Sequence, residues 1–285
     1  MIDYSQLRKW YGSLSVLYEM FPYLKKREFA LLVPSFLGNH KVYKTSTRML
    51  KCNNVQQIKY NLERLKWGER NLPYNFYYSL AKYGDGIPVQ SFNYAQRKEN
   101  NKNWTAEHWK HITGYDYLID VDSPDQENIA HAHQSARMLK NFFNQLNVPY
   151  EFRFSGCGFH FVIPSMYLPE LSFNPHKEHN IYKFLSKVSK KLLERFSEMI
   201  DVNIYDSRRL CKIPYSLAIY EQGNYVCHPF LDKGEFDNFY LNDLDPLIYP
   251  MKYNLLRRGG HVFNRDGNFE NLYNYIGVDA NGKKT

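Results

Sequence analysis

Between residues 115 and 199 the hydrophobic pattern alternates between the period of a strand and the period of a helix. Residues 115–121 (YDYLIDV), 152–154 and 159–163 have the apolar composition of buried strands, whereas residues 126–146 and 180–199 repeat apolar side chains at helical spacing. The order is β, α, β, β, α, with a glycine-containing turn between the last two strands. It predicts an α+β fold in which helices cover one face of a small antiparallel or mixed sheet.

The chain ahead of this region also mixes the two patterns. Residues 7–21 and 55–67 have helical spacing of apolar side chains, and residues 29–33 and 76–80 have the composition of strands. The segment NYAQRKENNKNW, residues 93–104, is polar and has no hydrophobic period, so it predicts a loop between two lobes. No repeat or low-complexity tract separates independent domains.

The positive charge of the chain is concentrated in its first part. Residues 1–112 contain 18 Lys and Arg against 8 Asp and Glu, whereas residues 113–285 contain 19 against 21. A basic part joined to a nearly neutral one suits a polyanion, because Lys and Arg that neutralise phosphates release condensed counterions. Solubility alone would also explain this charge.

The composition argues against a membrane or secreted protein. No run approaches the roughly 20 apolar residues of a membrane span, and the first residues, MIDYSQLRKWYG, lack the apolar core of a signal peptide. Cys52, Cys157, Cys211 and Cys227 form no Cys-x-x-Cys pair, so we expect reduced thiols and no zinc. We expect a cytoplasmic or nucleoid-associated protein.

A pair of carboxylates ends the first strand of the alternating region. Asp120 and Asp122, in the sequence IDVD, are two residues apart and therefore point to the same face of a strand. Like charges at the end of a buried strand repel each other and lose solvation, and a divalent cation would compensate both effects. Mg²⁺ and Mn²⁺ prefer such oxygen ligands. The alternative is that one carboxylate only caps the following turn, SPDQ.

A glycine-containing turn links the second and third strands. It reads FSGCGFH and contains Ser155, Gly156, Gly158 and His160. Glycines let backbone N–H groups approach phosphate oxygens, and Ser and His side chains add further donors. The turn therefore predicts a site for nucleotide phosphates, although a glycine hairpin with one buried His would look the same.

A third charged segment follows the second long helix. Asp201 comes directly after that helix and can supply a third carboxylate. Arg209 and Lys212 lie three residues apart in YDSRRLCKIPYS, where both can meet phosphate. A surface network of Arg and Asp is the alternative for this segment taken alone.

The order of these three motifs resembles the catalytic motifs of the archaeo-eukaryotic primase superfamily. They read Asp-x-Asp, then Ser-Gly-x-Gly-x-His, then hydrophobic-Asp followed by Arg-Leu-x-Lys-x-Pro-x-Ser. The family comprises the small catalytic subunits of primases and the primase-polymerases. KREFA at residues 26–30 and YYSLAKY at residues 77–83 are similar to two further family segments. The resemblance covers roughly residues 15–230.

The resemblance implies a primase-type catalytic core, in which an RNA-recognition-motif-like palm packs against an N-terminal α/β lobe. We expect one catalytic domain over residues 1–285. Its basic N-terminal lobe would cover about residues 1–112, its palm-like catalytic lobe about 113–250 and its C-terminal tail about 251–285.

Carried over to this sequence, the resemblance implies that Asp120, Asp122 and Asp201 are catalytic and hold two divalent metals, Mg²⁺ or Mn²⁺. The residues implied to bind the nucleotide are Ser155, Gly156, Gly158, His160, Arg209 and Lys212. The implied reaction is two-metal phosphoryl transfer from NTPs or dNTPs, which makes or extends a primer on single-stranded DNA. The template would contact Lys and Arg of the basic lobe, and the 17% aromatic content predicts that many rings lie at the surface or line a groove, where exposed rings can stack on bases.

Two departures from the family pattern predict a divergent member, associated with a mobile element or with defence. The stretch PYSLA at residues 214–218 lacks the His and the Gly-Lys pair that family members often have. The Cys/His zinc stem of many members is also missing, since SFNPHKEHN at residues 172–180 contains no Cys.

Other activities remain open as alternatives. One is a repair or defence primase-polymerase that mainly extends existing ends, and another is a catalytically silent nucleic-acid-binding subunit. A metal-dependent nuclease would also use carboxylates and metals, but it needs no site for a triphosphate. A large primase subunit, a helicase or a mobile-element or defence protein is the expected kind of partner.

Two pairs of histidines are set aside as metal ligands. His131 and His133 are two residues apart in a helical pattern and face different directions, so we expect solvated helix residues. His176 and His179 follow Pro175 without a third ligand nearby, which predicts a loop or the start of a helix.

Overall fold

The computed structural model describes the parts of the chain that form the sheets and their covering helices. The described residues are 9–33, 45–49, 54–64, 75–84, 108–122, 129–196, 200–220, 223–253 and 261–278. The helices are α2 (Leu14–Leu24), α3 (Val55–Arg64), α5 (Ile129–Gln145), α6 (Ile181–Phe196), α7 (Lys233–Asp237), α8 (Tyr249–Lys252) and α9 (Glu270–Tyr275). The strands are β1 (Phe29–Val33), β2 (Thr45–Met49), β3 (Asn75–Ser79), β4 (Ala81–Tyr83), β5 (Ile112–Tyr115), β6 (Tyr117–Asp122), β7 (Glu151–Phe154), β8 (Gly158–Ile163), β9 (Leu210–Lys212), β10 (Leu217–Tyr220) and β11 (Gly223–Val226).

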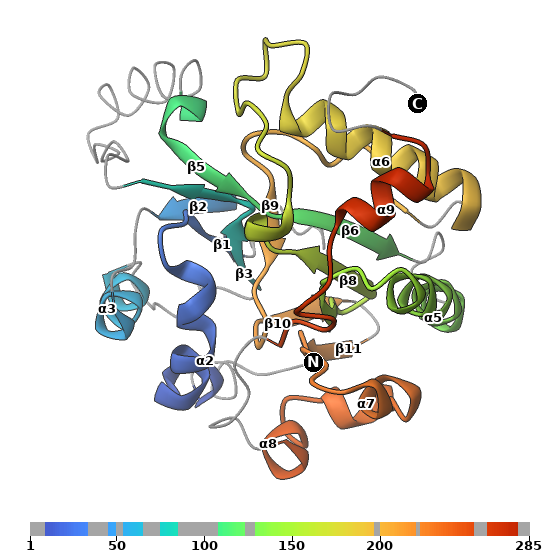
Figure 1. The fold of residues 1–285 in the computed structure, drawn as a ribbon. Helices are drawn as coiled ribbons and strands as arrows, with labels where there is room; N and C mark the ends of the chain where they lie inside the picture. The colour runs from blue at the N-terminus through green and yellow to red at the C-terminus, as the bar shows by residue number, and fades with distance from the viewer. Residues whose placement is uncertain are drawn as a thin grey trace, which may run out of the picture.

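Small antiparallel sheets form the centre of the molecule, and the helices lie around them (Figure 1). A four-stranded sheet has the order β2-β1-β3-β9, and a three-stranded sheet has the order β6-β8-β7. The strand pairs β4-β5 and β10-β11 are separate ladders. In Figure 1, α2 and α3 lie on the side of β1, whereas α5, α6 and α9 lie on the side of β6 and β8.

The expected β, α, β, β, α order is confirmed as β6, α5, β7, β8, α6, and with it the α+β class. The hairpin of β7 and β8 inserts β8 beside β6, with Tyr117 opposite Ile163 and Phe152 opposite Phe161. Helix α5 packs against β6 and β8 because its buried side chains repeat at helical spacing on one face. The assignment of this sheet to an RNA-recognition-motif-like palm stays a prediction.

The strand predicted over residues 115–121 is wrong in one respect, because Asp116 divides it. Strand β5 pairs with β4, whereas β6 pairs with β8. The Asp116 carboxylate accepts a hydrogen bond from the Ser165 N–H (2.8 Å) and forms an ion pair with Arg27. The Asp116 N–H donates to the Leu80 carbonyl at 2.9 Å. Because Asp116 bonds these tertiary partners, it belongs to neither the β4–β5 ladder nor the β6–β8 ladder.

The N-terminal predictions are confirmed for the strands and modified for the first helix. Strand β1 has the predicted bounds, and β3 begins one residue early. A helical turn at residues 9–12 is separated from α2 by Ser13, so residues 9–21 are not one continuous helix. Residues 7 and 8, residues 65–67, the predicted loop at 93–104 and Cys52 lie outside the described residues.

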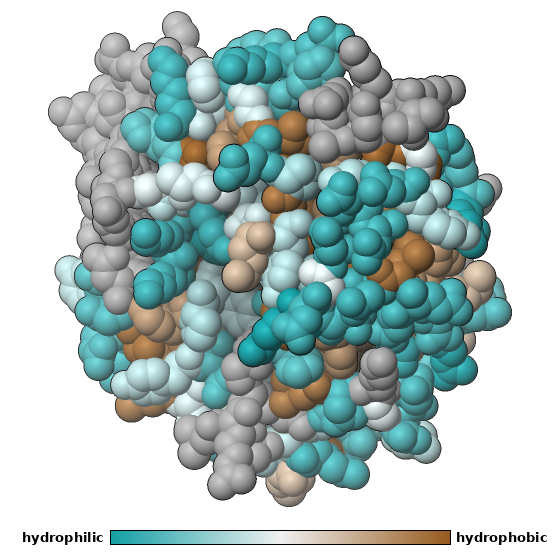
Figure 2. Space-filling view, viewed as in Figure 1, coloured by the Kyte–Doolittle hydropathy of each residue, from teal (hydrophilic) through white to brown (hydrophobic). Residues whose placement is uncertain are grey.

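Many rings were expected at the surface or along a groove, and the surface part of this expectation is wrong for the described part of the chain. Phe152, Phe159, Phe230 and Phe236 contact one another over the outer face of the three-stranded sheet and are at most 2% exposed. The described rings that are exposed by half or more belong to Tyr18, Tyr60, Tyr240 and Tyr275. Figure 2 accordingly shows a mostly hydrophilic face with apolar residues in separate small groups.

Part of the segment assigned to a C-terminal tail packs into the core. Phe269 and Tyr273 contact Phe184 of α6 edge to face, and Tyr275 contacts Phe142 of α5 in the same way. The backbones of Phe263 and Tyr150 exchange hydrogen bonds of 3.2 and 2.8 Å. The segment at 261–278 therefore covers α5 and α6, as Figure 1 shows for α9.

Within the described residues, none of the helices combines the length and the apolar character that crossing a membrane requires.

Candidate active site

The three-stranded sheet carries a row of charged side chains across its inner face. Asp120 of β6 lies opposite His160 of β8, and His160 lies opposite Arg153 of β7. Directly opposed residues of antiparallel strands point to the same face, so the three side chains form one row. The row faces β9 of the four-stranded sheet, where Cys211 and Lys212 contact it. A polar layer thus lies between the two sheets.

Asp120 and His160 form a buried ion pair in this row. The His160 Nε2 atom lies 3.2 Å from Asp120 Oδ1, and the two side chains are 9% and 15% exposed. Burial alone would raise the pKa of Asp120, but the charges of His160, Arg209 and Lys212 hold it below its ordinary value. For His160, burial opposes the charge, but Asp120 and Cys211 outweigh it and raise the pKa to about 9. Asp120 is therefore ionised and His160 is an imidazolium at neutral pH.

Asp122 is less well neutralised than Asp120. Burial, together with the nearby charge of Asp120, raises the pKa of Asp122 to about 6. Its Oδ1 atom accepts a weak hydrogen bond from the Cys157 thiol at 3.5 Å. A side chain at Gly158 would collide with the Asp122 carboxylate and the Val121 carbonyl, so glycine is required beside this carboxylate.

The turn between β7 and β8 is tight and internally braced. Gly156 has a φ of 116°, which favours glycine, and the Ser155 N–H donates to the Gly158 carbonyl at 2.9 Å. Lys212 is 5% exposed, and its ammonium donates to the Ser155 carbonyl at 2.6 Å. Lys212 thus holds the turn in place, which is a different contact from the phosphate contact implied by the resemblance.

Asp201 is brought beside Asp120 through the backbone. The Asp201 N–H donates to the Asp120 carbonyl at 3.1 Å, and Ile200 forms an isolated bridge with Val121. The Asp201 carboxylate is 43% exposed, lies 3.9 Å from the Arg209 guanidinium and accepts from the Asn203 N–H at 2.9 Å. All three predicted carboxylates therefore lie at one end of β6.

Arg209 combines an exposed guanidinium end with an unsatisfied buried atom. Its side chain is 35% exposed, and its Nε atom is buried without a hydrogen-bond partner in the described part of the chain. A buried donor without a partner costs on the order of 1–3 kcal/mol, so an acceptor such as a phosphate oxygen would be stabilising here.

Sequence reasoning missed the roles of Cys211 and Arg153. The Cys211 sulfur lies 3.4 Å from His160 Nδ1, so this thiol contacts the predicted nucleotide-binding His. Burial would raise the pKa of Cys211, but His160 and Arg153 lower it overall. Arg153 is 1% exposed and donates to the Tyr78 hydroxyl at 3.0 Å. An Arg between two Phe in a strand was the available signal.

The carboxylates at the end of β6 supply oxygen donors of the kind that a divalent metal binds. Asp120 Oδ1 is buried and makes no hydrogen bond beyond its ion pair with His160 in the described part of the chain, and Asp122 is held near another carboxylate. Both observations fit a hard cation with oxygen ligands. In the described ranges no group of three or more His, Cys, Asp or Glu side chains is already arranged around one metal position. Asp201, which turns toward Arg209, is the side chain that would have to reorient.

The histidines set aside are placed differently by the structure. His133 is not a solvated helix residue, because it stacks on Phe236 with ring centroids 4.4 Å apart and its pKa is lowered by burial. His131 is exposed. His176 and His179 are exposed in the loop before α6, as expected. Cys157, Cys211 and Cys227 are free thiols.

The chain was compared with known proteins. No family model and no curated protein matches it. Among solved structures it is similar to the polymerase domain from Mycobacterium tuberculosis Ligase D in complex with DNA, at 13% sequence identity and a TM-score of 0.54. The match covers 96% of this chain and 92% of that chain. The chain has the fold of this polymerase domain.

Proposed function

We propose that the chain is a DNA-dependent nucleotidyltransferase of the primase-polymerase type, which makes or extends primers from NTPs or dNTPs. One observation carries the proposal. The end of β6 brings together three carboxylates and the cationic groups of His160 and Arg209, and Asp120 Oδ1 makes no hydrogen bond beyond its ion pair with His160 in the described part of the chain. Such a charge separation suits a metal-bound triphosphate, since carboxylates hold the metals and cations hold the phosphates.

We assign the metals to the three carboxylates at the end of β6. Asp120, Asp122 and Asp201 would hold two Mg²⁺ or Mn²⁺ ions. When bound, such ions lower the pKa of a 3′-hydroxyl and stabilise a leaving pyrophosphate. The chain's own contribution is positioning, because the carboxylates come from a rigid strand and from the segment bridged to it.

The phosphates would be held from the side of the third motif. Arg209 is exposed enough to reach them and has a free buried Nε in the described part of the chain. His160 is an imidazolium, so it can donate to an anion when Asp120 turns to a metal. Gly156 and Gly158 leave the turn open to close approach, and Lys212 keeps Ser155 in place.

The fold similarity supports the same reading, since the similar structure is a polymerase domain in complex with DNA. The basic first lobe fits a DNA template as the partner, because it carries the excess of Lys and Arg.

The test is incorporation of labelled nucleotide on single-stranded DNA with Mg²⁺ or Mn²⁺, with and without a primer. The intact protein is compared with Asp120→Asn/Asp122→Asn, which keeps the shape of the site and removes both charges. We expect metal-dependent synthesis by the intact protein and a loss of at least a hundredfold in the variant. The unprimed reaction separates priming from extension.

The control is Glu194→Gln, which removes an exposed carboxylate of α6 that is 61% exposed. It should retain full activity. Synthesis that survives in the Asp120→Asn/Asp122→Asn variant would overturn the proposed site. Degradation of the template in place of synthesis would favour a nuclease.

A further inference from the structure

A second charged region lies at the opposite end of β6 from Asp122. It is a cleft of about 410 Å³ between the end of α2, β3, β4 and the sheet of β7 and β8. Its charged lining residues are Lys25, Lys26, Arg27, Lys82, Asp116 and Glu151. None of them belongs to the predicted catalytic or nucleotide-binding set. At roughly 3.3 Å per residue, the six residues of β6 separate the cleft at Asp116 from Asp122 by about 20 Å.

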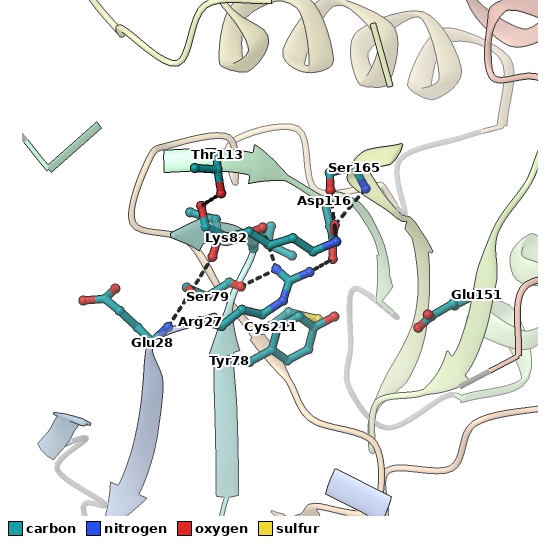
Figure 3. Close-up of polar contacts among 12 residues, drawn as sticks. Arg27, Glu28, Tyr78, Ser79, Lys82, Thr113, Asp116, Glu151, Ser165 and Cys211 are labelled. Carbon is teal, nitrogen blue, oxygen red and sulfur yellow. Dashed lines mark hydrogen bonds and ion pairs between the residues drawn. The ribbon is translucent and has the colours of Figure 1, made fainter. Parts of the chain in front are cut away.

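Each carboxylate of the cleft is neutralised by its own arginine. Asp116 pairs with Arg27, whose other nitrogen donates to the carbonyls of Ser79 and Leu80 at 2.8 Å (Figure 3). Glu151 lies 3.4 Å from Arg153, which is fully buried behind the cleft. Both arginines are thus paired with carboxylates of the protein itself. The positive charge that remains at the cleft belongs to lysines.

The three lysines have little or no compensation. Lys82 donates to the Ser165 hydroxyl at 3.0 Å and lies 3.6 Å from Asp116, which is already paired (Figure 3). Lys25 and Lys26 are exposed, and in the described ranges neither ammonium has an ion-pair or hydrogen-bond partner. Like charges gathered at a concave surface attract anions.

Lys26, which lines the cleft, has a strained backbone conformation. The Arg27 N–H donates to the Leu24 carbonyl at 3.1 Å and closes a turn. Within the turn, Lys25 has φ −63° and ψ 121°, and Lys26 has φ 60°. These are the angles of a type II turn, whose third position favours glycine. A lysine at this position costs stability, and such outliers gather at ligand sites.

We propose that this cleft binds a backbone phosphate of single-stranded nucleic acid through the ammonium groups of Lys25, Lys26 and Lys82. The proposal rests on the proposed function for the source of the phosphate, a template strand, and not on catalysis. A cleft about 20 Å from Asp122 is within the length of strand that such proteins cover, roughly 4 nucleotides or more. Tyr23 and Tyr78 form its wall, with their rings against Arg153.

The test measures binding of a fluorescent oligo(dT) by anisotropy over a range of salt concentrations, without metal. The variant is Lys25→Ala/Lys26→Gly. We expect at least tenfold weaker binding at low salt and a fall in the slope of log affinity against log salt of about 0.7, because about 0.7 is lost per phosphate contact on a single strand. The melting temperature should stay the same or rise, because glycine relieves the turn. Lys26→Arg should retain binding.

The matched control is Lys190→Ala/Lys191→Ala, an adjacent lysine pair on α6. Equal weakening in this control, or an unchanged salt slope in the cleft variant, would overturn the proposal. Competition for the cleft by inorganic phosphate or a nucleoside triphosphate, with oligonucleotide binding unchanged by the variant, would also overturn it in favour of a free-phosphate site. Asp120→Asn/Asp122→Asn should bind oligo(dT) normally here, so loss of synthesis and loss of cleft binding are separate results.

Discussion

Asp116 and Asp122 stand at the two ends of β6 and differ in how their charges are balanced. Asp116 has an arginine, a lysine and a backbone N–H around its carboxylate. Asp122 has a weak thiol donor and a second carboxylate nearby, and its pKa is raised to about 6 by burial and by Asp120. The same residue type thus serves structure at one end of the strand and is left unsatisfied at the other.

The difference shows which carboxylates are available to a ligand. A buried carboxylate with a full set of partners stabilises the fold and has no free capacity. A buried carboxylate without such partners is destabilising unless a cation or proton arrives. The number of hydrogen-bond and ion-pair partners therefore distinguishes Asp116 from Asp122, although the sequence shows both only as acidic residues of one strand region.

The largest expected effect is at Asp116. Asp116→Asn leaves the buried Arg27 guanidinium without its ion pair, so the free energy of unfolding should fall by about 3–5 kcal/mol. Urea denaturation measures it. Glu194→Gln, which breaks an exposed pair with Lys191, should cost less than about 1 kcal/mol and serves as the control. Equal small losses in both variants would remove the contrast between the ends of β6.

The next effect concerns the Asp120–His160 pair and pH. The pKa of His160 is raised from 6.5 to about 9, so the pair's stabilisation is complete below pH 6.5 and is lost as pH rises through 9. His160→Gln should therefore be less stable than the intact protein by on the order of 2 kcal/mol at pH 6 and nearly equal to it at pH 10. Metal-free denaturation at both pH values is the measurement. A difference in the free energy of unfolding that does not change with pH would contradict the ion pair between Asp120 and His160.

At the other end of the comparison, Asp122→Asn should stabilise the metal-free protein. Removal of a charge whose pKa is raised to about 6 relieves its burial and its repulsion with Asp120. The free energy of unfolding at pH 8 in EDTA should rise by about 1–2 kcal/mol. Mn²⁺ binding, followed by calorimetry, should be lost in the same variant. A less stable variant would show that Asp122 has structural partners after all.

The smallest effect sharpens the role of Cys211. Cys211→Ala removes the sulfur beside His160 Nδ1, and the net worth of such a contact is about 0.5–1.5 kcal/mol. The pKa of His160 should fall by about half a unit, because part of the support for its charge is gone. NMR titration of the imidazole measures the change, and Cys211→Ser should shift it less. A rise in the pKa would exclude this role.

The parts of the fold that the sequence predicted are those set by local pattern. Strand β8 and helix α5 could be predicted from the spacing of their apolar residues, because both pack against the same core. All residues of β8 are buried, whereas α5 buries one face. The break at Asp116 could not be predicted, since Arg27 lies 89 residues away in the chain. His133 was missed for the same reason, because Phe236 lies 103 residues further on.

The site shows the same limit. The i, i+2 spacing of Asp120 and Asp122 on one strand face is a local property, and the structure has both on β6. That Lys212 bonds the Ser155 carbonyl, and that Cys211 contacts His160, depends on how β9 lies against the other sheet. Whether a Lys or Arg side chain faces a ligand or a backbone carbonyl depends on tertiary packing, which the local sequence pattern does not determine.

The pairing of β9 with β3 has a consequence for synthesis of the protein on the ribosome. Tyr77 pairs with Lys212, the Trp10 indole donates to the Tyr215 carbonyl, and the Tyr11 hydroxyl accepts from the Leu217 N–H, 206 residues away. The first hundred residues therefore emerge without the strand that completes their sheet. Contacts this distant in sequence slow folding, so β3 exposes an open sheet edge until nearly three quarters of the chain has been made.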